Sequence, residues 1–241
     1  MVTNEKGKVM GKQYAQKWKD SLSEELKFWR RWLTEDEFKR NREPRLKSMQ
    51  LGIPEDLIDL SEKETLYVLD VGSGPLSTIG RSHPQYNVKL TSCDPLADEY
   101  NNLLRDVGLM DKADIINASG ENLKDVFPSN TFHIVHSANA LDHAYDPLVC
   151  IQNMIDVCRP GGWVYIISVE NEGERQQYCG LHQWNLEIAD NDVRLWNKKQ
   201  DFYIKKYLKN IGEFISRPVD HHNNMPMFEL KIQKKKGPVS P

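Results

Sequence analysis

Apolar residues near the start of the chain recur at steps of three and four. Over residues 14–33 the apolar positions of this repeat are Tyr14, Trp18, Leu22, Leu26, Trp29 and Leu33. The spacing predicts a long amphipathic α-helix, because residues three and four apart share one helical face. Thr34 and Glu37 have the spacing of a capping box for a second helix, and Pro54 suits the first turn of a short third helix.

After residue 64 the pattern changes to short apolar runs that alternate with helical segments. The apolar runs occupy residues 66–69, 88–93, 113–118, 132–137 and 163–169. The helical patterns between them occupy residues 97–107 and 147–158. Strands that alternate with helices predict βαβ units and a mainly parallel sheet. A helix over residues 202–208 and two last strands, over 213–217 and 228–233, are expected to follow.

These patterns divide the chain into two parts. We expect a helical cap over residues 1–61 and an α/β domain over residues 62–241. The length of 241 residues suits one large α/β domain with such an attachment. Ligands of open α/β sheets bind at the carboxyl ends of the strands, so we expect the aromatic-rich N-terminal helices to cover that edge as a lid.

The charge balance and the cysteines limit the classes of function. The chain has 32 Lys and Arg against 35 Asp and Glu, so it lacks the positive field typical of nucleic-acid binding. No apolar run approaches the roughly 20 residues of a membrane span, and residues 1–12 lack the apolar segment of a signal peptide. The four cysteines show no C-x-x-C spacing, which is typical of reduced thiols. We expect a cytoplasmic protein without a nucleic-acid partner, and a homodimer stays open.

The strongest local motif is a glycine turn directly after the first predicted strand. Residues 69–74 read Leu-Asp-Val-Gly-Ser-Gly, and such glycines let the backbone pass close beneath a ligand. Ser77 takes the place of the third glycine of a dinucleotide fingerprint, which disfavours an NAD-type dehydrogenase. Asp94 ends the next strand about 20 residues later, where a carboxylate can accept both hydroxyls of a ribose. A chain reversal and an ordinary Asp-Pro turn are the structural alternatives for the two motifs.

Five motifs in order give the chain a resemblance to a known family. After the glycine turn and Asp94 come Ala-Ser-Gly-Glu-Asn-Leu at residues 118–123, Phe-His-Ile-Val-His-Ser-Ala-Asn-Ala-Leu-Asp-His at 132–143 and Arg-Pro-Gly-Gly at 159–162. Over residues 66–170 the chain resembles the class I S-adenosylmethionine-dependent methyltransferases, and more closely the small single-domain type that act mostly on small molecules. The resemblance implies a Rossmann-like α/β sheet of seven mainly parallel strands. Its last strand, over residues 228–233, would run antiparallel between the fifth and the sixth.

The resemblance also implies S-adenosylmethionine as the cofactor. In that family the glycine turn carries the methionine part, the acid after the second strand binds the ribose, and the acid before the turn orders the turn and the cofactor's amino group. Ser119 stands where the family usually has an aspartate that meets the adenine amine, and a hydroxyl can also accept that bond. The expected cofactor-binding residues are Asp70, Gly72, Ser73, Gly74, Asp94, Pro95, Ser119, Gly120, Glu121, Ser137 and Ala138.

Residues 137–143 should pass beside the sulfonium and the acceptor, as the resemblance implies. His143 lies in this segment and His182 in a polar loop after the fifth strand, and an imidazole can take a proton from a hydroxyl near neutral pH. We expect one of them to be the general base, and prefer His143 because Asp142 and Asp146 are close in sequence. The Asp-His pair could instead cap the following helix. The expected substrate contacts are Trp32, Asn139, His143, His182 and Trp184.

These residues predict methyl transfer from S-adenosylmethionine to a small-molecule or glycan acceptor, at oxygen if a histidine is the base. Asp142 with Asn139 is too small a ligand set for metal-assisted transfer, and we predict no metal site. The alternative is a non-catalytic cofactor-binding module whose N-terminal helices dock a partner protein through exposed Trp and Phe side chains. Phe28 and Trp32, one turn apart on the first helix, either roof the pocket or pack in the core.

Overall fold

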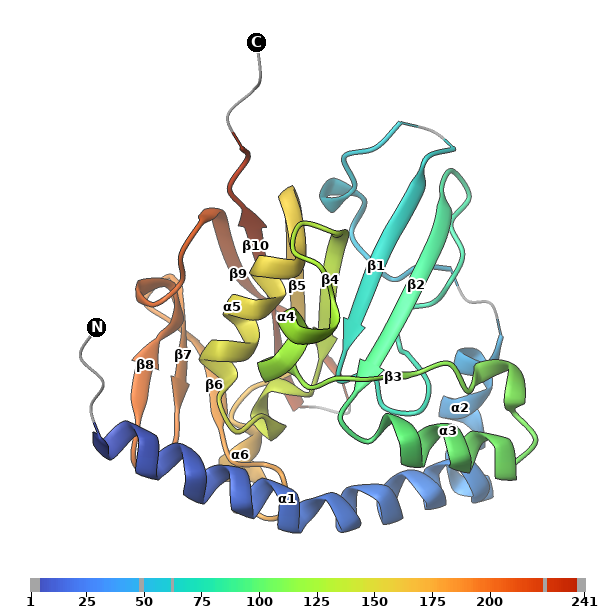
Figure 1. Ribbon diagram of the computed structural model, residues 1–241, viewed down its shortest axis with the longest axis horizontal. Helices are drawn as coiled ribbons and strands as arrows, with labels where there is room; N and C mark the ends of the chain where they lie inside the picture. Colours follow the sequence, from blue (N-terminus) through green and yellow to red (C-terminus); the bar gives the residue numbers. More distant parts are fainter. Residues whose placement is uncertain (1–4, 48–49, 62, 223–224, 238–241) are drawn as a thin grey trace.

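The apolar runs after residue 64 form one seven-stranded sheet with the order β3-β2-β1-β4-β5-β10-β9 (Figure 1). The computed structural model describes residues 5–47, 50–61, 63–222 and 225–237, with the backbone alone for residues 5–19 and 220–222. The strands are β1 (Thr65–Val71), β2 (Asn87–Asp94), β3 (Ile116–Asn117), β4 (Phe132–Ala138), β5 (Cys158–Val169), β9 (Ile211–His222) and β10 (Met225–Lys234).

The pairing of the strands confirms the predicted Rossmann-like fold. β1 pairs in parallel with β2 on one side and with β4 on the other, and β4 pairs in parallel with β5. β10 is antiparallel to both of its neighbours, β5 and β9. The strand order reverses between β1 and β4, and ligands of open α/β sheets bind at the carboxyl ends beside such a switch point.

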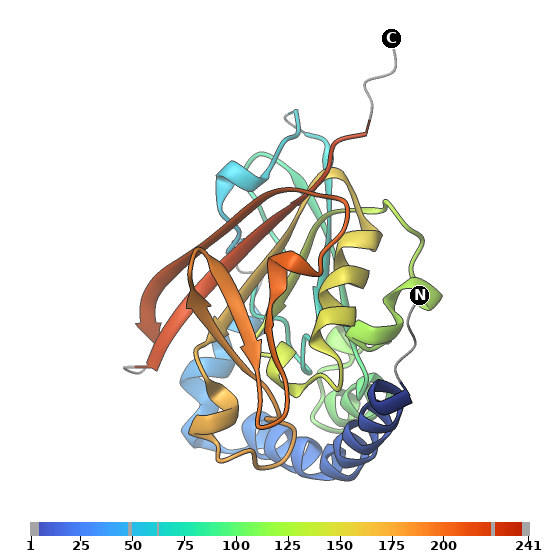
Figure 2. The same ribbon diagram turned by 90° about the vertical axis from the view of Figure 1, so that its left-hand side faces the viewer.

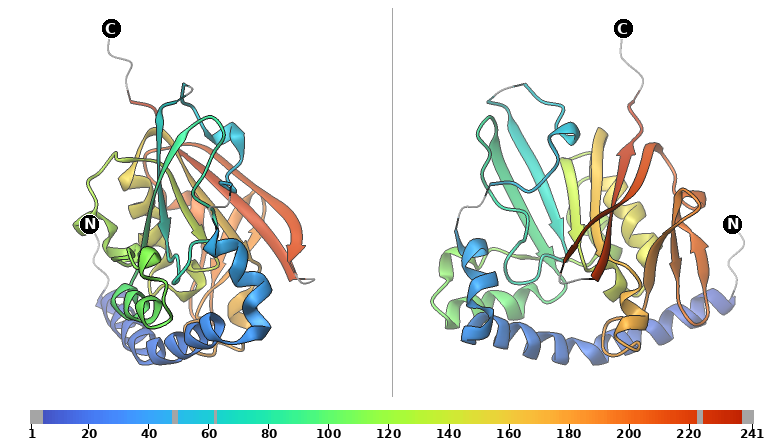
Figure 3. Two further views of the ribbon diagram at one scale, coloured as in Figure 1. Left: turned by 90° about the vertical axis from the view of Figure 1, so that its right-hand side faces the viewer. Right: turned by 180° about the vertical axis from the view of Figure 1, so that it is seen from behind.

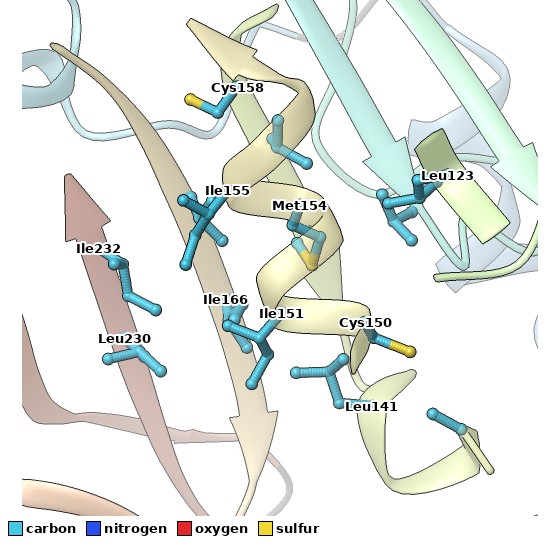
Figure 4. Packing of buried hydrophobic residues seen from close by; sticks show 14 of the residues in the cluster. Leu123, Leu141, Cys150, Ile151, Met154, Ile155, Cys158, Ile166, Leu230 and Ile232 are labelled. Atoms are coloured by element: carbon cyan, nitrogen blue, oxygen red, sulfur yellow. The ribbon is translucent and has the colours of Figure 1, made fainter. Parts of the chain in front are cut away.

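Helix α5 (Pro147–Val157) covers one face of the sheet with an apolar surface. Figure 4 shows Ile151 and Ile155 of this helix beside Ile166 of β5 and beside Leu230 and Ile232 of β10. All five side chains are buried, and burial of that kind contributes about 1.5–3 kcal/mol per side chain relative to exposure. The antiparallel strand β10 is therefore part of the main core and not an appended edge.

Short elements complete the layers around the sheet. The segment before β1 packs Leu51, Ile53 and Leu57 into a second core on the other face, with one 3-10 turn, η2 (Glu55–Leu57), where a short helix was predicted. The remaining helices and turns after β1 are α3 (Ala97–Asp106), η3 (Met110–Lys112), η4 (Gly120–Asn122), α4 (Leu123–Val126), η5 (Leu141–His143), α6 (Glu172–Arg175) and η6 (Ile204–Lys206).

Helix α1 (Glu5–Thr34) crosses the carboxyl edge of the sheet, toward which the arrowheads of β1 and β2 point (Figure 1, Figure 3). Leu22, Leu26 and Trp29 pack against a core cluster shared with α3, and Leu33 is buried in it. Tyr14 and Trp18, also predicted for this face, lie outside the residues whose side chains are described. Helix α1 thus takes the predicted position of a lid, and α2 (Lys39–Leu46) follows it after the 3-10 turn η1 (Asp36–Phe38). Within the described ranges, no helix combines the length and the apolar character that a membrane crossing requires.

Two local predictions are wrong. Thr34 ends α1 and its hydroxyl donates to the Arg30 carbonyl oxygen at 2.8 Å, so it does not cap a second helix. The helix expected over residues 202–208 is replaced by β8 (Asp201–Tyr203) and η6. β8 joins β6 (Asn185–Ala189) and β7 (Asp192–Trp196) in a three-stranded antiparallel sheet beside β9 (Figure 2). Val193 and Leu195, two residues apart in β7, are both fully buried. This alternation is typical of a strand and not of a helix.

The buried position of β10 can be tested at Phe228, which is fully buried. We expect Phe228→Ala to lower the free energy of unfolding by about 3–5 kcal/mol, because it leaves a cavity in the core. Urea denaturation followed by circular dichroism measures this change. Ile215→Ala on β9, where the side chain is 40% exposed, is the control and should cost well under half as much. Equal losses in the two variants would contradict the described packing.

Candidate active site

A cavity of about 670 Å³ lies at the carboxyl edge of the sheet, between α1 and the loops that follow β1 to β5. Its lining is strongly acidic, since it holds seven carboxylates and one guanidinium. The carboxylates belong to Glu24, Glu25, Asp70, Asp94, Glu121, Asp142 and Glu172, and the guanidinium belongs to Arg45. Such a lining favours a ligand with positive charge.

The glycine turn borders this cavity and packs tightly on both of its sides. Gly72 and Gly74 have φ values of +69° and +59°, which side chains rarely adopt. A Cβ atom on Gly72 would lie 2.5 Å from the Cβ of Ala140, and one on Gly74 would lie 2.9 Å from Cζ2 of Trp29. The turn therefore requires glycine for its backbone conformation and for the close approach of α1.

Asp70 holds the glycine turn to the neighbouring strand. It is buried at the end of β1, where Ser77 donates its hydroxyl to Oδ2 at 2.6 Å and His136 Nδ1 donates to Oδ1 at 2.7 Å. Ser77, which departs from the dinucleotide fingerprint, is thus a hydrogen-bond donor to the acid before the turn. His136 is fully buried in β4 and was missed by the sequence analysis, because a histidine within an apolar run gives no sign of its partner.

Asp94 ties the end of β2 to the same turn. The backbone N–H of Gly74 donates to Oδ2 at 3.1 Å and that of Leu96 donates to Oδ1 at 2.9 Å. Burial raises the pKa of Asp94 to about 7, although these two N–H groups oppose the rise, and the charges of Glu25 and Asp70 add to it. Pro95 lies beside it in the cavity wall. The carboxyl group is consequently poised to change its charge near neutral pH.

The loop after β3 contributes Ser119, Gly120 and Glu121 to the cavity, as expected. Ser119 and Asn122 form a capping box for η4, in which the Ser119 N–H donates to Asn122 Oδ1 at 2.8 Å. Glu121 Oε1 accepts the N–H groups of Tyr145 and Asp146 at 3.0 and 3.2 Å. The Glu121 carboxylate therefore fixes this loop against the segment after β4.

The structure brings together the two histidines that the sequence placed in separate loops. His182 Nδ1 lies 2.6 Å from Asp142 Oδ2, and His143 Nε2 lies 3.0 Å from His182 Nδ1. Asp142 is buried, whereas the imidazoles keep 20% and 29% of their side-chain surface exposed and line the cavity. We call these three residues the Asp-His-His cluster. Burial lowers the pKa of His182, but the hydrogen bond and charge of Asp142 outweigh it and leave that pKa raised.

Of the two carboxylates expected beside His143, only Asp142 lies within reach of its ring. Asp142 Oδ2 lies 3.5 Å from His143 Nε2, much farther than from His182 Nδ1. Asp146 instead caps α5, where its carboxylate accepts the N–H of Val149 at 3.2 Å. The preference for His143 on account of two nearby carboxylates is therefore not supported by the contacts.

Residues 137–139 reach the cavity at the carboxyl end of β4. Ser137 donates its hydroxyl to the Val71 carbonyl oxygen at 2.9 Å, which fixes the end of β4 beside the glycine turn. Asn139 has a φ of +48°, and its Oδ1 accepts the N–H of Val169 at 2.9 Å. Asn139 thus lines the cavity, but its side-chain oxygen already joins β4 to the end of β5.

Two expected substrate contacts are core residues. Trp32 and Trp184 are 5% and 3% exposed, belong to hydrophobic clusters and do not border the cavity. On α1 the aromatic side chains at the cavity are those of Phe28 and Trp29. Trp32 lies one helical turn after Phe28, where it packs in the hydrophobic cluster that α1 shares with α3.

Arg45 was not predicted as a site residue, because an arginine in a highly charged helix is usually exposed to solvent. Its guanidinium lies 4.9 Å from the centre of the Trp32 ring, and its Nη1 donates to the Leu76 carbonyl oxygen at 3.2 Å. Burial lowers its pKa, and the charge of Asp70 opposes that change. Among the lining residues that the structure describes, Arg45 therefore places the single guanidinium close to the glycine turn.

Part of the chain is similar in sequence to known methyltransferases. Residues 69–166 match the family described as methyltransferase domain. An uncharacterized methyltransferase of Schizosaccharomyces pombe is 36% identical over 110 residues, a match that covers 42% of this chain and 39% of that protein. Two solved structures show a limited structural similarity to the chain. A possible histamine N-methyltransferase of Thermotoga maritima has a TM-score of 0.48 and 12% identity over 91% of this chain and 100% of that one. The N-methyltransferase NodS of Bradyrhizobium japonicum has a TM-score of 0.47 and 12% identity over 84% and 99%.

The strand order, the antiparallel β10 and the glycine turn followed by Asp94 define the fold of a class I methyltransferase. With the family match over residues 69–166, the chain contains an S-adenosylmethionine-dependent methyltransferase domain of that class. Its cofactor is S-adenosylmethionine.

The contact between Trp29 and Gly74 can be measured against a matched glycine. Gly108 has a φ of +80° and no atom within 4 Å of the site of a Cβ, whereas Gly74 has both a positive φ and the Trp29 ring. We expect Gly108→Ala to cost about 1–2 kcal/mol of stability through the backbone alone, and Gly74→Ala to cost more. In a Trp29→Ala background the excess at Gly74 should vanish, which a double-mutant cycle of unfolding free energies detects. The same cost at both glycines would refute the contact.

Proposed function

We propose that this chain transfers the methyl group of S-adenosylmethionine to an oxygen atom of a small-molecule or glycan acceptor. The observation that carries this proposal is the Asp-His-His cluster, which faces the same cavity as the glycine turn and Asp94. Two imidazoles beside a buried carboxylate suit an acceptor that must lose a proton, and a hydroxyl is a poor nucleophile until it does.

The cofactor would lie over the glycine turn with its ribose on Asp94. Each Asp94 oxygen accepts one backbone N–H and has capacity for one ribose hydroxyl as well. Arg45 is the guanidinium nearest to the turn among the lining residues and suits the carboxylate of the methionine part. The acidic lining favours the positively charged sulfonium. Pro95, Ser119, Gly120, Ser137 and Ala138 would complete the cofactor contacts by their place in the wall.

The reaction itself is a single displacement. A lone pair of the acceptor oxygen forms a bond to the methyl carbon, and the carbon–sulfur bond breaks with its electron pair on sulfur, which yields S-adenosylhomocysteine. The hydroxyl proton leaves at the Asp-His-His cluster, where His143 or His182 accepts it. Residues 1–61 would act as a cap that excludes water and positions both ligands, because α1 closes one side of the cavity.

The alternative of a non-catalytic docking module finds little support on α1. Trp29 packs against Gly74 and Tyr100, and Trp32 is buried. Phe28 is 47% exposed, yet it borders the cavity and contacts Trp29. The described aromatic side chains of α1 are thus directed to the fold and the cavity.

Formation of S-adenosylhomocysteine with a panel of sugars, phenols, amines and carbon acids tests the proposal. An O-methylated product is expected, identified by mass spectrometry and NMR. An N-methylated or C-methylated product would overturn the choice of oxygen, and the absence of turnover with every acceptor would favour a binding module.

Asp94 should control cofactor affinity in a pH-dependent way. Asp94→Ala removes a charge-assisted acceptor and should weaken binding of S-adenosylmethionine by about 1.5–3 kcal/mol. Since the pKa of Asp94 is raised to about 7, its carboxyl is largely neutral below that pH, and wild-type affinity should rise between about pH 6 and 8. Calorimetry should show the wild-type affinity and the same pH dependence in Asp98→Ala, an exposed acid on α3, whereas Asp94→Ala should lose that pH dependence. Unchanged affinity in Asp94→Ala would contradict the assignment of Asp94 to the ribose of the cofactor.

The cluster should control transfer and leave the cofactor bound. We expect His143→Ala and His182→Ala each to slow single-turnover methyl transfer about a hundredfold, with cofactor affinity unchanged. His133→Asn serves as the control, because His133 lies at the start of β4 and outside the cavity lining. If both cluster variants transferred at the wild-type rate, positioning alone would be the mechanism.

A further inference from the structure

The three side chains of the Asp-His-His cluster direct one atom each to a common point. Asp142 Oδ2, His143 Nε2 and His182 Nδ1 are separated by 2.6, 3.0 and 3.5 Å. We propose that these three atoms bind one divalent first-row transition-metal ion. The sequence analysis predicted no metal site, because it paired Asp142 with Asn139 and had no reason to add His182 from a loop 39 residues farther on.

Protons alone satisfy this arrangement poorly. An ionised carboxylate only accepts hydrogen bonds, and each imidazole nitrogen offers either one hydrogen or one lone pair. If His182 Nδ1 gives its hydrogen to Asp142, a hydrogen on His143 Nε2 would point at the same N–H group, so Nε2 must present its lone pair there. Two acceptors then share one hydrogen. A cation at that point would instead interact with three lone pairs.

The spacing of the three atoms fits a coordinated ion. Transition-metal distances are about 2.0–2.1 Å to imidazole nitrogen and about 2.0–2.2 Å to carboxylate oxygen. Ligand atoms at that radius lie about 2.8–3.6 Å apart in octahedral or tetrahedral coordination. The separations of 3.0 and 3.5 Å lie in this range, and a small rotation of the side chains would widen the third, of 2.6 Å.

Backbone contacts hold the two segments together independently of the imidazoles. The N–H of Gln183 donates to the Asp142 carbonyl oxygen at 2.9 Å. The Gln183 side chain donates to the Gly180 carbonyl oxygen at 2.7 Å, which closes the loop that carries His182. The ligand atoms are therefore arranged before an ion binds, and this lowers the cost of binding.

The surroundings favour a transition metal with an open position. Asp142 is buried behind the two imidazoles, which border the cavity, so protein would cover one side of the ion and leave the other to a ligand. Glu25 and Glu172 in the same lining add negative charge. Two imidazoles with one carboxylate suit zinc, iron or manganese, whereas magnesium prefers oxygen ligands throughout.

The role of the ion in the reaction rests on the proposed function, although the binding site itself does not. The acceptor hydroxyl would take the open position, lose its proton to solvent water at lower pH than it does when free, and keep a lone pair for the methyl carbon. With the ion bound, the nitrogens that face it no longer accept protons. The ion would then replace a histidine as the group that activates the hydroxyl.

Binding is tested on the full chain with Co²⁺ and Zn²⁺ alone. We expect one Co²⁺ per chain, visible in its d–d absorption, and displacement by Zn²⁺. His143→Ala, His182→Ala and Asp142→Asn should each weaken Co²⁺ binding at least about tenfold, while His133→Asn should leave it unchanged. Thermal unfolding and cofactor binding check that the variants are folded.

A measurement on the wild-type chain avoids dependence on the variants. Among the seven histidines, Zn²⁺ should shift the ring-nitrogen NMR signals of two, His143 and His182. The inference is overturned if Co²⁺ fails to bind at millimolar concentration, or if only histidines outside the cluster respond.

Activity separates this inference from the proposed function. Chelator-treated protein should lose methyl transfer and regain it with Zn²⁺, Fe²⁺ or Mn²⁺. Full transfer by metal-free protein would overturn the role of the ion and leave the proposed function intact. Metal binding without methyl transfer to any acceptor would overturn the proposed function and leave the metal site intact.

Discussion

The buried carboxylate of Asp70 is the group on which the position of the cavity wall depends most. A charge taken out of water must find hydrogen-bond partners, and Asp70 has them in Ser77 and His136. One bond fixes the exit of the glycine turn, and the other fixes β4 beside β1. Loss of either donor would leave a buried acceptor unsatisfied, at a cost of about 1–3 kcal/mol or more for a charged group. This explains a fully buried histidine in the middle of the sheet.

The arrangement at Asp94 depends on this constraint. Its Oδ2 accepts the N–H of Gly74, which lies three residues before Ser77. The glycine turn is therefore held from both sides. Asp70 and Asp94 are both buried and lie at fixed places in the same wall of the cavity. The site is thus built as a connected set of hydrogen bonds between strand ends, and α1 covers it from outside through Trp29.

The part of the cavity around the glycine turn and Asp94, where we propose that the cofactor binds, could be located from the sequence because its signals are local. A buried strand, two glycines and an acid follow one another within about 25 residues, and parallel strands bring their ends to one edge. The acceptor half depends on contacts between distant segments. The fold of the loop after β5 decides which carboxylate pairs with His182. The position of each tryptophan along α1 decides that Trp29, and not Trp32, borders the cavity. The prediction of a helix over residues 202–208 was wrong for a similar reason. β8 forms there because it pairs with β7, and local periodicity does not show that partner strand.

The contributions to the cavity are divided along the chain. The part over the glycine turn and Asp94 comes from residues 70–96, whereas the part around the Asp-His-His cluster comes from residues 139–143 and 179–182, with α1 shared by both. Substitutions in the second set can change what is bound there without altering the first. One wall of the cavity can therefore stay constant while the other is matched to a different ligand through two short loops.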